Sequence, residues 1–328
     1  MPSFSVFDLV PITQGSNAPT ALKRALELAQ HAEGWGYRRY WVAEHHNMPG
    51  IASAATSVVI GYIAGGTKTI RVGSGGVMLP NHSPLVIAEQ FGTLESLYPG
   101  RIDLGLGRAP GTDARTLAAL GRSSTSSDYF PQQVLELQAL LGPIQPDQRV
   151  KAIPGTGTNV PLWILGSSLF GARLAAQLGL PYAFAAHFAP QELTAALGIY
   201  RKEFKPSEAH KRPQVMVCVN VIAAETDAEA TKLFTSTQQS VTNIFRGRRG
   251  QLPPPIDDID EYWTLEEQPQ ALAWLTCSFV GSSATVKNGL KAFIEETDAD
   301  EIMVHSAIYD PAARLKSYEI LSKIKQGL

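Results

Sequence analysis

One glutamate and two histidines end an apolar stretch in the first fifty residues of this 328-residue chain. The segment "WVAEHHNMPG" covers residues 41–50, and its apolar part stops at Glu44, His45 and His46. Imidazole has an ordinary pKa near neutrality, so a histidine at such a position suits proton transfer. Adjacent residues of a strand point to opposite faces, so the two rings do not readily bind one metal ion. The pair indicates either a general base or two rim histidines satisfied by Glu44 or the backbone.

A second group of residues has the chemistry of an anion site. Arg108 follows the apolar segment 101–107, and Gly166, Ser167 and Ser168 stand between another apolar segment and a predicted helix. Free backbone N–H groups at a helix start and an arginine guanidinium both suit a phosphate group. The alternative is an ordinary serine cap and a structural ion pair.

Small residues mark a third place where a ligand has room. The sequence "GSGG" at 73–76 closes another apolar segment, and Gly75 and Gly76 carry no side chain. Backbone without side chains lets a flat ligand approach closely. A tight turn between a strand and a helix is the alternative interpretation.

Histidines are concentrated at the ends of the predicted strands. Five of the seven in the chain lie there: His45, His46, His82, His187 and His305. We expect His46, His187 and His305, together with Phe188, to line a substrate pocket of mixed polar and apolar character. Neither H-x-H nor H-x-x-x-H spacing nor a dense carboxylate cluster accompanies them, so we expect no metal site.

The elements that must position these residues alternate regularly along the chain. Eight strands are predicted at residues 4–10, 39–44, 69–76, 101–107, 161–166, 182–188, 214–224 and 301–307. Helices are predicted between them, as over 19–33, where apolar residues recur at helical spacing. Strands that are apolar on both faces are typical of a parallel sheet covered by helices. Eight such units favour an α/β fold, the closed (β/α)₈ TIM barrel, over an open sheet. The strand ends listed above then meet at the barrel mouth, where active sites of this fold lie.

We expect one domain over residues 1–328, with loop insertions near 143–160 and 246–265. The net charge of −2 gives no support for nucleic-acid binding. Cys218 and Cys277 match no disulfide or metal pattern, which favours a reducing compartment. Neither a signal peptide nor a membrane-spanning stretch is visible, so we expect a cytoplasmic protein.

Three stretches of the sequence resemble the bacterial luciferase-like flavin monooxygenase family. They are "WVAEHHN", "VGSGGVMLPNHSPLVIAEQFGTLESLYPGRIDLGLGRAPGTD" and the region from "LWILGSS" to "YAFAAHFAP". The likeness runs from "FDLVPI" to "IYDPAARLKSYEIL" and is most specific in the first 110 residues and around 161–190. It is greatest for the single-chain luciferase-family oxidoreductases, not for the light-emitting heterodimers.

The resemblance implies that an FMN-type flavin lies across the barrel mouth. It assigns His45 as the catalytic base and places a non-prolyl cis peptide bond, Gly75–Gly76, beneath the flavin ring. It also implies that Arg108 and the backbone amides of the segment 166–168 hold the flavin phosphate.

The sequence departs from luciferases at two positions. Gly166 stands where luciferases have a glutamate, and Gly107 stands where they have a reactive cysteine. These changes leave flavin binding intact and argue against a long-chain aldehyde substrate. The segment 246–265 corresponds to the mobile lid of luciferases, unless it is an insertion without a role.

The expected function is therefore a flavin-dependent monooxygenase. A separate flavin reductase supplies reduced FMN, which reacts with O₂ to form a 4a-hydroperoxyflavin that oxygenates a small organic substrate. Three alternatives stay open: a deazaflavin-dependent oxidoreductase that moves hydride, a non-catalytic flavin-binding protein and a metal-dependent barrel hydrolase. The family also implies a homodimer.

Overall fold

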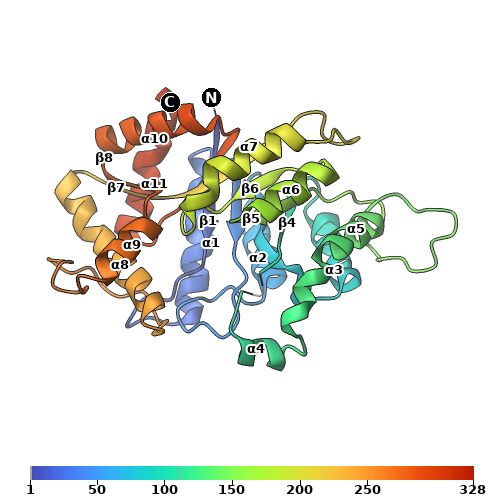
Figure 1. Cartoon of the computed structure of the whole chain (residues 1–328), viewed down its shortest axis with the longest axis horizontal. Coiled ribbons are helices and arrows are strands. Elements are labelled where there is room, and N and C mark those ends of the chain that lie inside the picture. Colours follow the sequence, from blue (N-terminus) through green and yellow to red (C-terminus); the bar gives the residue numbers. More distant parts are fainter. Residues whose placement is uncertain (1, 110) are drawn as a thin grey trace.

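Parallel strands close into a barrel in the computed structural model, which describes residues 2–109 and 111–328 (Figure 1). Its strands are β1 (Ser3–Asp8), β2 (Arg39–Val42), β3 (Arg71–Met78), β4 (Ile102–Gly107), β5 (Leu162–Gly166), β6 (Tyr182–Phe184), β7 (Val215–Ala224) and β9 (Glu301–His305). Each pairs in parallel with the next, and β9 pairs with both β7 and β1. This last pairing closes the ring and confirms the predicted TIM barrel.

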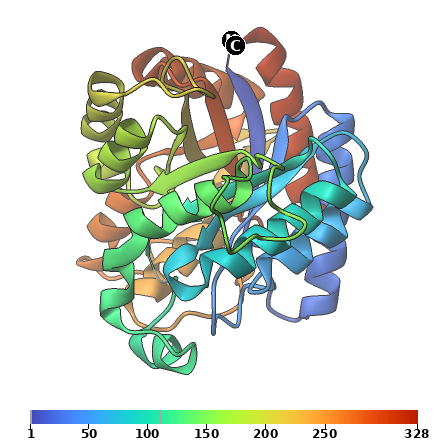
Figure 2. The same ribbon diagram turned by 90° about the vertical axis from the view of Figure 1, so that its right-hand side faces the viewer.

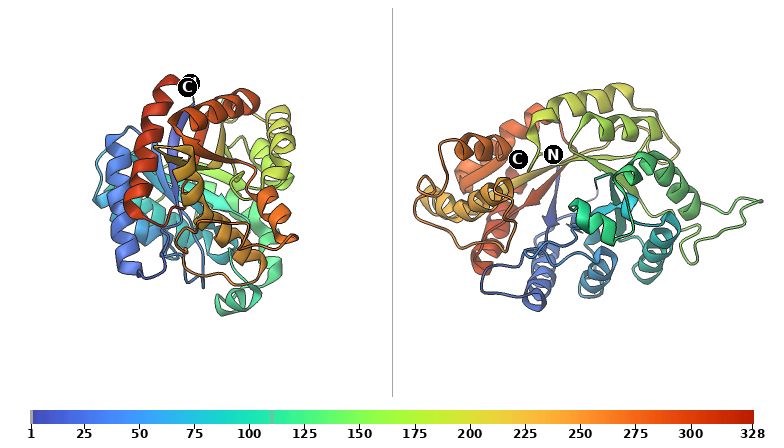
Figure 3. Two further views of the ribbon diagram at one scale, coloured as in Figure 1. Left: turned by 90° about the vertical axis from the view of Figure 1, so that its left-hand side faces the viewer. Right: turned by 60° about the horizontal axis from the view of Figure 1, so that its bottom comes forward.

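Helices surround the strands on the outside (Figure 3). They are α1 (Ala18–Gly34), α2 (Thr56–Gly65), α3 (Pro84–Leu97), α4 (Ala114–Ala119), α5 (Phe130–Leu141), α6 (Leu169–Leu178), α7 (Leu193–Glu203), α8 (Asp227–Phe245), α9 (Glu267–Trp274), α10 (Ser283–Thr297) and α11 (Pro311–Ile324). Figure 2 shows α2, α3 and α5 side by side on one outer face. In α1, the Asn17 side chain caps the N-terminus by accepting a hydrogen bond from the Thr20 amide. Buried alanines and Leu28 then face the sheet at helical spacing.

One strand lies outside the barrel and was not predicted. The first half of β7, Met216–Asn220, pairs with β9. Its second half, Asn220–Ala224, extends beyond β9 and pairs with β8 (Ser278–Ser282). Its sequence "SFVGS" has only two large apolar residues and runs directly into α10. A segment this short gives no clear alternating pattern, so its strand state depends on the exposed edge of β7.

The loop insertions that the sequence indicates contain neither helix nor strand. Residues 143–160 follow α5 and extend away from the barrel (Figure 1). Residues 246–265 follow α8, and Leu252 forms an isolated bridge with Thr13 at the barrel mouth. Within the described residues, no helix has both the length and the apolar character that crossing a membrane requires.

Side chains that point into the barrel form layers along its axis. Because side chains alternate between the two faces of a strand, Glu301, Met303 and His305 of β9 all point inward. The middle layer is apolar and contains Phe7, Trp41, Ala43, Trp163, Ala183, Met216, Cys218 and Met303. This layer separates a charged end of the barrel from the mouth at the opposite end.

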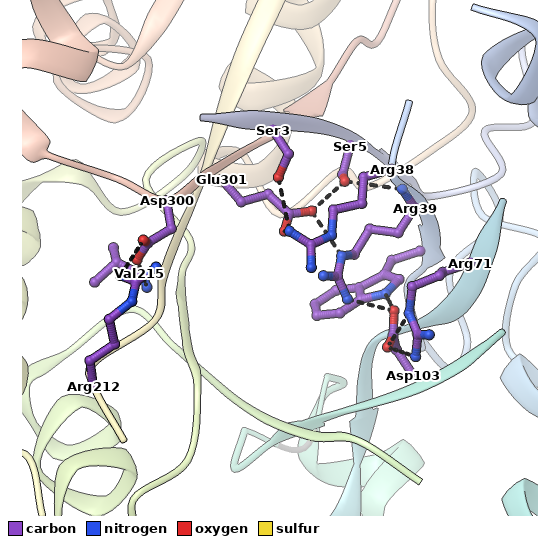
Figure 4. Close-up of polar contacts among 11 residues, drawn as sticks. Ser3, Ser5, Arg38, Arg39, Arg71, Asp103, Arg212, Val215, Asp300 and Glu301 are labelled. Atoms are coloured by element: carbon purple, nitrogen blue, oxygen red, sulfur yellow. Dashed lines mark hydrogen bonds and ion pairs between the residues drawn. The ribbon is translucent and has the colours of Figure 1, made fainter. Parts of the chain in front are cut away.

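The charged end is a buried ion-pair network (Figure 4). Arg39 donates from Nη1 to Asp103 Oδ2 at 2.7 Å and from Nε to Glu301 Oε1 at 2.8 Å. Arg71 adds a 2.6 Å ion pair to the other oxygen of Asp103, and the Ser5 hydroxyl donates to Glu301. The side chains of Arg39, Asp103 and Glu301 are buried, so these two ion pairs at the centre of the network are shielded from water.

Candidate active site

A cavity of about 660 Å³ opens at the C-terminal ends of the barrel strands. Ten of the residues that the sequence indicated contribute to its lining: His45, Gly75, Gly76, Arg108, Gly166, Ser167, Ser168, His187, Phe188 and His305. They come from loops or strand ends that are far apart in the sequence, and barrel closure brings them together. His46 does not line the cavity, so the prediction that it belongs to the substrate pocket is wrong.

Two glycines of β3 form part of the cavity floor. The bond between Gly75 and Gly76 is cis, as the resemblance implied. A Cβ atom at Gly75 would lie 2.9 Å from the ring of Phe7, and one at Gly76 would lie 2.7 Å from the carbonyl oxygen of Gly105. Both positions therefore exclude a side chain. They lie within β3, where the register to β4 shifts, and β3 continues two residues beyond the predicted end of this strand at residue 76.

Free hydrogen-bond donors gather at one side of the cavity. Ser168 is the N-cap of α6, yet its hydroxyl makes no capping hydrogen bond. The Arg108 guanidinium stacks over Phe170 in the first turn of this helix, with Cζ 4.1 Å from the ring centroid. It has no carboxylate partner in the described part of the chain. The helix start and the arginine together present positive charge and N–H groups suited to a phosphate.

Three neutral imidazoles lie at the cavity wall. Burial, assisted by the positive charge of Arg249, lowers the pKa of His45 to about 4. Burial also lowers the pKa of His305 to about 4 and that of His187 well below its ordinary value. All three rings are therefore uncharged at neutral pH. Among the described residues, Nδ1 of His45 and Nδ1 of His187 are buried without a hydrogen-bond partner.

An asparagine in β7 fixes the tautomer of His305. The amide nitrogen of Asn220 donates to the His187 carbonyl at 2.8 Å, so its oxygen faces His305 Nδ1 at 3.0 Å. The neutral ring must donate from Nδ1, which leaves Nε2 as a hydrogen-bond acceptor. Sequence reasoning missed Asn220, although it is the one strongly polar residue in the apolar run "VMVCVNVIAA".

Glu44 binds two histidines other than His45. His46 Nε2 lies 2.9 Å and His82 Nε2 lies 2.8 Å from the same oxygen, Glu44 Oε1. Burial raises the pKa of Glu44, but these two hydrogen bonds outweigh it and hold the pKa below its ordinary value. The carboxylate in turn raises the pKa of His46. Glu44 thus orients His46 and His82, and it makes no contact of this kind with His45.

The segment after α8 covers the cavity near His45. Residues 249–252 contribute to the lining, and the Leu252 amide donates to the Ile12 carbonyl at 3.0 Å. Arg246 anchors the start of the segment through a 2.7 Å ion pair with Glu267. The exposed Arg249 side chain has no ion-pair partner within the described residues. Sequence reasoning missed two residues of the lining. Arg249 lies in a segment without a regular pattern, and Trp274 ends the short helix α9, which was not predicted.

Comparison with known proteins gives end-to-end similarity. The profile of the family described as luciferase-like monooxygenase matches residues 3–301. A protein of Escherichia coli (strain K12) named luciferase-like monooxygenase is 55% identical over 327 residues, which cover 99% of this chain and 98% of that protein. The N-acetyl-S-alkylcysteine monooxygenase of Bacillus subtilis (strain 168) is 30% identical over 334 residues, covering 97% and 96%.

Solved structures extend this similarity to the fold. The crystal structure of apo-MsnO8 matches with a TM-score of 0.88 at 35% identity and covers 99% of both chains. The FMN complex of the oxygenating constituent of 3,6-diketocamphane monooxygenase from Pseudomonas putida matches with a TM-score of 0.75 at 18% identity, covering 98% of this chain and 97% of that one. An F420-dependent secondary alcohol dehydrogenase gives 0.72 at 16%, covering 99% and 98%. These last two show the fold alone.

Proposed function

The chain belongs to the luciferase-like monooxygenase family, and on that premise we propose that it is a monooxygenase that uses reduced FMN and O₂ to oxygenate a small organic acid. The observation that carries the proposal is the set of groups that the mostly apolar cavity brings together. It has a side-chain-free floor, phosphate-type donors at Arg108 and Ser168, and the neutral ring of His45.

The residues present fit an FMN molecule. Gly75 and Gly76 leave room for a flat ring, while Arg108 and the backbone amides of Ser167 and Ser168 would hold the phosphate. The unpartnered Nδ1 of His45 is an orphaned buried atom that a ligand can satisfy. When bound, reduced FMN supplies two electrons, one oxygen atom of O₂ goes to the substrate, and the other leaves as water.

The chain's own side chains would bind, orient and move protons. His45 is neutral and faces the cavity, so it can accept a proton from a reacting group. Nε2 of His305 can accept a second hydrogen bond, because Asn220 holds the ring in one tautomer. The apolar middle layer and the segment 249–252 would exclude water from the reacting atoms.

The phosphate site gives the direct test of flavin binding. In Arg108→Ala, we expect the affinity for FMN to fall about 10- to 100-fold, because a hydrogen bond to a charged group contributes about 1.5–3 kcal/mol. Fluorescence titration with oxidised FMN, and anaerobically with reduced FMN, measures this. Arg173→Ala is the matched control, since Arg173 is an exposed residue of the same helix α6. Equal affinities for the two variants would remove Arg108 from the proposed site.

A deazaflavin-dependent oxidoreductase is the second candidate function. It is favoured by the F420-dependent dehydrogenase that shares the fold over 99% of this chain. The same titration, repeated with a deazaflavin and followed by measurement of O₂ consumption, distinguishes the two. Tighter binding of reduced FMN with O₂ uptake supports the monooxygenase. Tighter binding of deazaflavin without O₂ uptake assigns hydride transfer. The flavin reductase and the homodimer remain predictions.

Arg249 supports an acidic substrate. It is a second cation in the cavity wall without an ion-pair partner among the described residues. The proposed FMN phosphate is assigned to Arg108, so Arg249 is left for another anion. It lies near enough to His45 to lower the pKa of that ring, so it is close to the proposed base. One relative acts on an N-acetyl-S-alkylcysteine, which carries a carboxylate. We infer that Arg249 binds the acidic group of the substrate.

In Arg249→Met, we expect KM for an acidic substrate to rise roughly tenfold, with a smaller change in kcat and no change in FMN affinity. Methionine replaces the aliphatic part of the arginine side chain but removes the guanidinium charge and its hydrogen-bond donors, so the ion pair is lost while much of the apolar packing is kept. Steady-state kinetics with an S-alkylcysteine derivative and its amide measure the effect. Arg248→Met is the control, because Arg248 is exposed and does not line the cavity. If KM rises equally for the acid and for its amide, Arg249 does not bind the negative charge of the substrate.

A further inference from the structure

Glu44, His46 and His82 place three ligand-type atoms close together beside the cavity. One carboxylate oxygen and two imidazole nitrogens lie within 4.8 Å of one another. None of the three side chains contributes to the cavity lining, and the proposed flavin chemistry uses none of them. Two of them follow β2 in the sequence, while His82 follows β3, so only the barrel brings them together.

We propose that Glu44, His46 and His82 bind a single divalent transition-metal ion of the Zn²⁺ type. Two imidazoles and one carboxylate form a donor set typical of Zn²⁺, with a fourth position left for water. Such a set also accepts Co²⁺, whereas Mg²⁺ and Ca²⁺ prefer oxygen donors alone. The proposed metal site does not depend on the identity of the flavin or of the substrate, because its three side chains lie outside the cavity lining.

The distances suit an ion after a small expansion. Nε2 of His46 and Nε2 of His82 lie 2.9 Å and 2.8 Å from Glu44 Oε1. Tetrahedral ligation at about 2.0–2.1 Å separates ligand atoms by roughly 3.3 Å, so each ring needs to retreat by about 0.5 Å. The side chains of His46 and His82 are 17% and 29% exposed, which lets an ion arrive from solvent and leaves the rings room to move.

Neighbouring groups hold the backbone and the carboxylate in place. The Met78 amide donates to the second oxygen of Glu44 at 3.3 Å, and the Thr112 hydroxyl donates to the His46 carbonyl at 3.2 Å. The His82 amide donates to the Leu79 carbonyl at 2.9 Å. The Met78 hydrogen bond acts on a ligand group itself, and a bond of that type orients a metal ligand and raises affinity, whereas the other two hold the backbone of His46 and His82. The buried Glu44 carboxylate supplies the acidic ligand: its Oε1 faces both imidazoles, and its Oε2 accepts the hydrogen bond from the Met78 amide.

Occupancy of this site would connect two segments of the proposed active site. Glu44 directly precedes His45, and Met78, which Glu44 holds, is two residues after Gly76. An ion bound by Glu44, His46 and His82 would therefore join the loop after β2 to the end of β3. The sequence alone did not indicate this site, because His82 is 38 residues from Glu44 and no short spacing motif links them.

The test is a calorimetric titration of the full chain, free of affinity tags and treated with chelator, with Zn²⁺ alone. We expect one Zn²⁺ per chain with micromolar or tighter affinity, and at least a tenfold loss in both His46→Gln and His82→Gln. His31→Gln is the matched control, because His31 is exposed and stacks on Trp35 in α1. Wild-type protein that binds no Zn²⁺ in the micromolar range, or a loss in His31→Gln equal to that in His82→Gln, would overturn the proposal.

A second readout does not depend on how well the variants fold. Co²⁺ added to the wild-type protein should give the intense visible absorption of a tetrahedral site, and Zn²⁺ should displace it one for one. Only the weak absorption of hexahydrated Co²⁺ would overturn the site even where His82→Gln fails to fold. Thermal denaturation with and without Zn²⁺ should show stabilisation of the wild type that is absent in the folded His46→Gln protein.

Discussion

Replacing His45 with asparagine is expected to lower kcat by about 10²- to 10⁴-fold, the usual contribution of a general base, while FMN affinity stays nearly unchanged. Asparagine preserves a polar side chain of similar size but cannot accept a proton. Stopped-flow turnover with reduced FMN, O₂ and substrate measures kcat, and a parallel titration measures flavin affinity. His31→Asn on the outer helix α1 is the control for substitution of a histidine as such. Full turnover by His45→Asn with flavin bound would rule His45 out as the base.

The pH dependence of this effect follows from the lowered pKa of His45. Its pKa is about 4, so the ring is neutral and able to accept a proton throughout the neutral range. Activity of the wild-type enzyme should fall as the pH approaches 4, and His45→Asn should lack this step. Because the folded-state pKa lies below the ordinary value of 6.5, the neutral ring also contributes stability above pH 6.5 that is lost as the pH falls towards 4.

The barrel could be predicted from the sequence because its signals are local and repeated. A capped helix such as α1 and a buried strand such as β4 carry their periodicity within a few turns or a few residues. The strand β8 could not be predicted in this way, since its strand state comes from pairing with a distant partner, Asn220–Ala224. The single domain and the cytoplasmic location stay predictions.

The candidate site could be predicted where it follows from position in the barrel. Arg108 and Ser168 follow strands directly, so the fold alone places them at the mouth. The direction of each histidine could not be predicted, and His46 proves to turn away towards Glu44. Asn220 is polar within an apolar strand, and that signal was available. Arg249 was not predictable, because its position depends on where an irregular segment crosses the mouth.

Replacing Arg39 with methionine is expected to lower the free energy of unfolding by about 3–5 kcal/mol, the cost of breaking a buried ion pair on one side. Arg39 binds Asp103 and Glu301, whose side chains are fully buried. Asp103 keeps its pair with Arg71, but Glu301 keeps only the Ser5 hydroxyl and an Arg38 guanidinium 3.8 Å away. Denaturation in urea, followed by tryptophan fluorescence, measures the loss.

An exposed ion pair on the same face is the matched control for this prediction. Arg212 pairs with Asp300 at 2.9 Å, but its side chain is 77% exposed, so Arg212→Met should cost no more than about 1 kcal/mol. Adding Glu301→Gln to Arg39→Met should recover part of the loss, because it removes the charge left unpaired. If Arg39→Met costs no more than Arg212→Met, the charged end of the barrel is not held by this pair. Such a result would mean that water reaches and solvates the Glu301 carboxylate from the charged end of the barrel, on the side of the apolar layer away from the mouth.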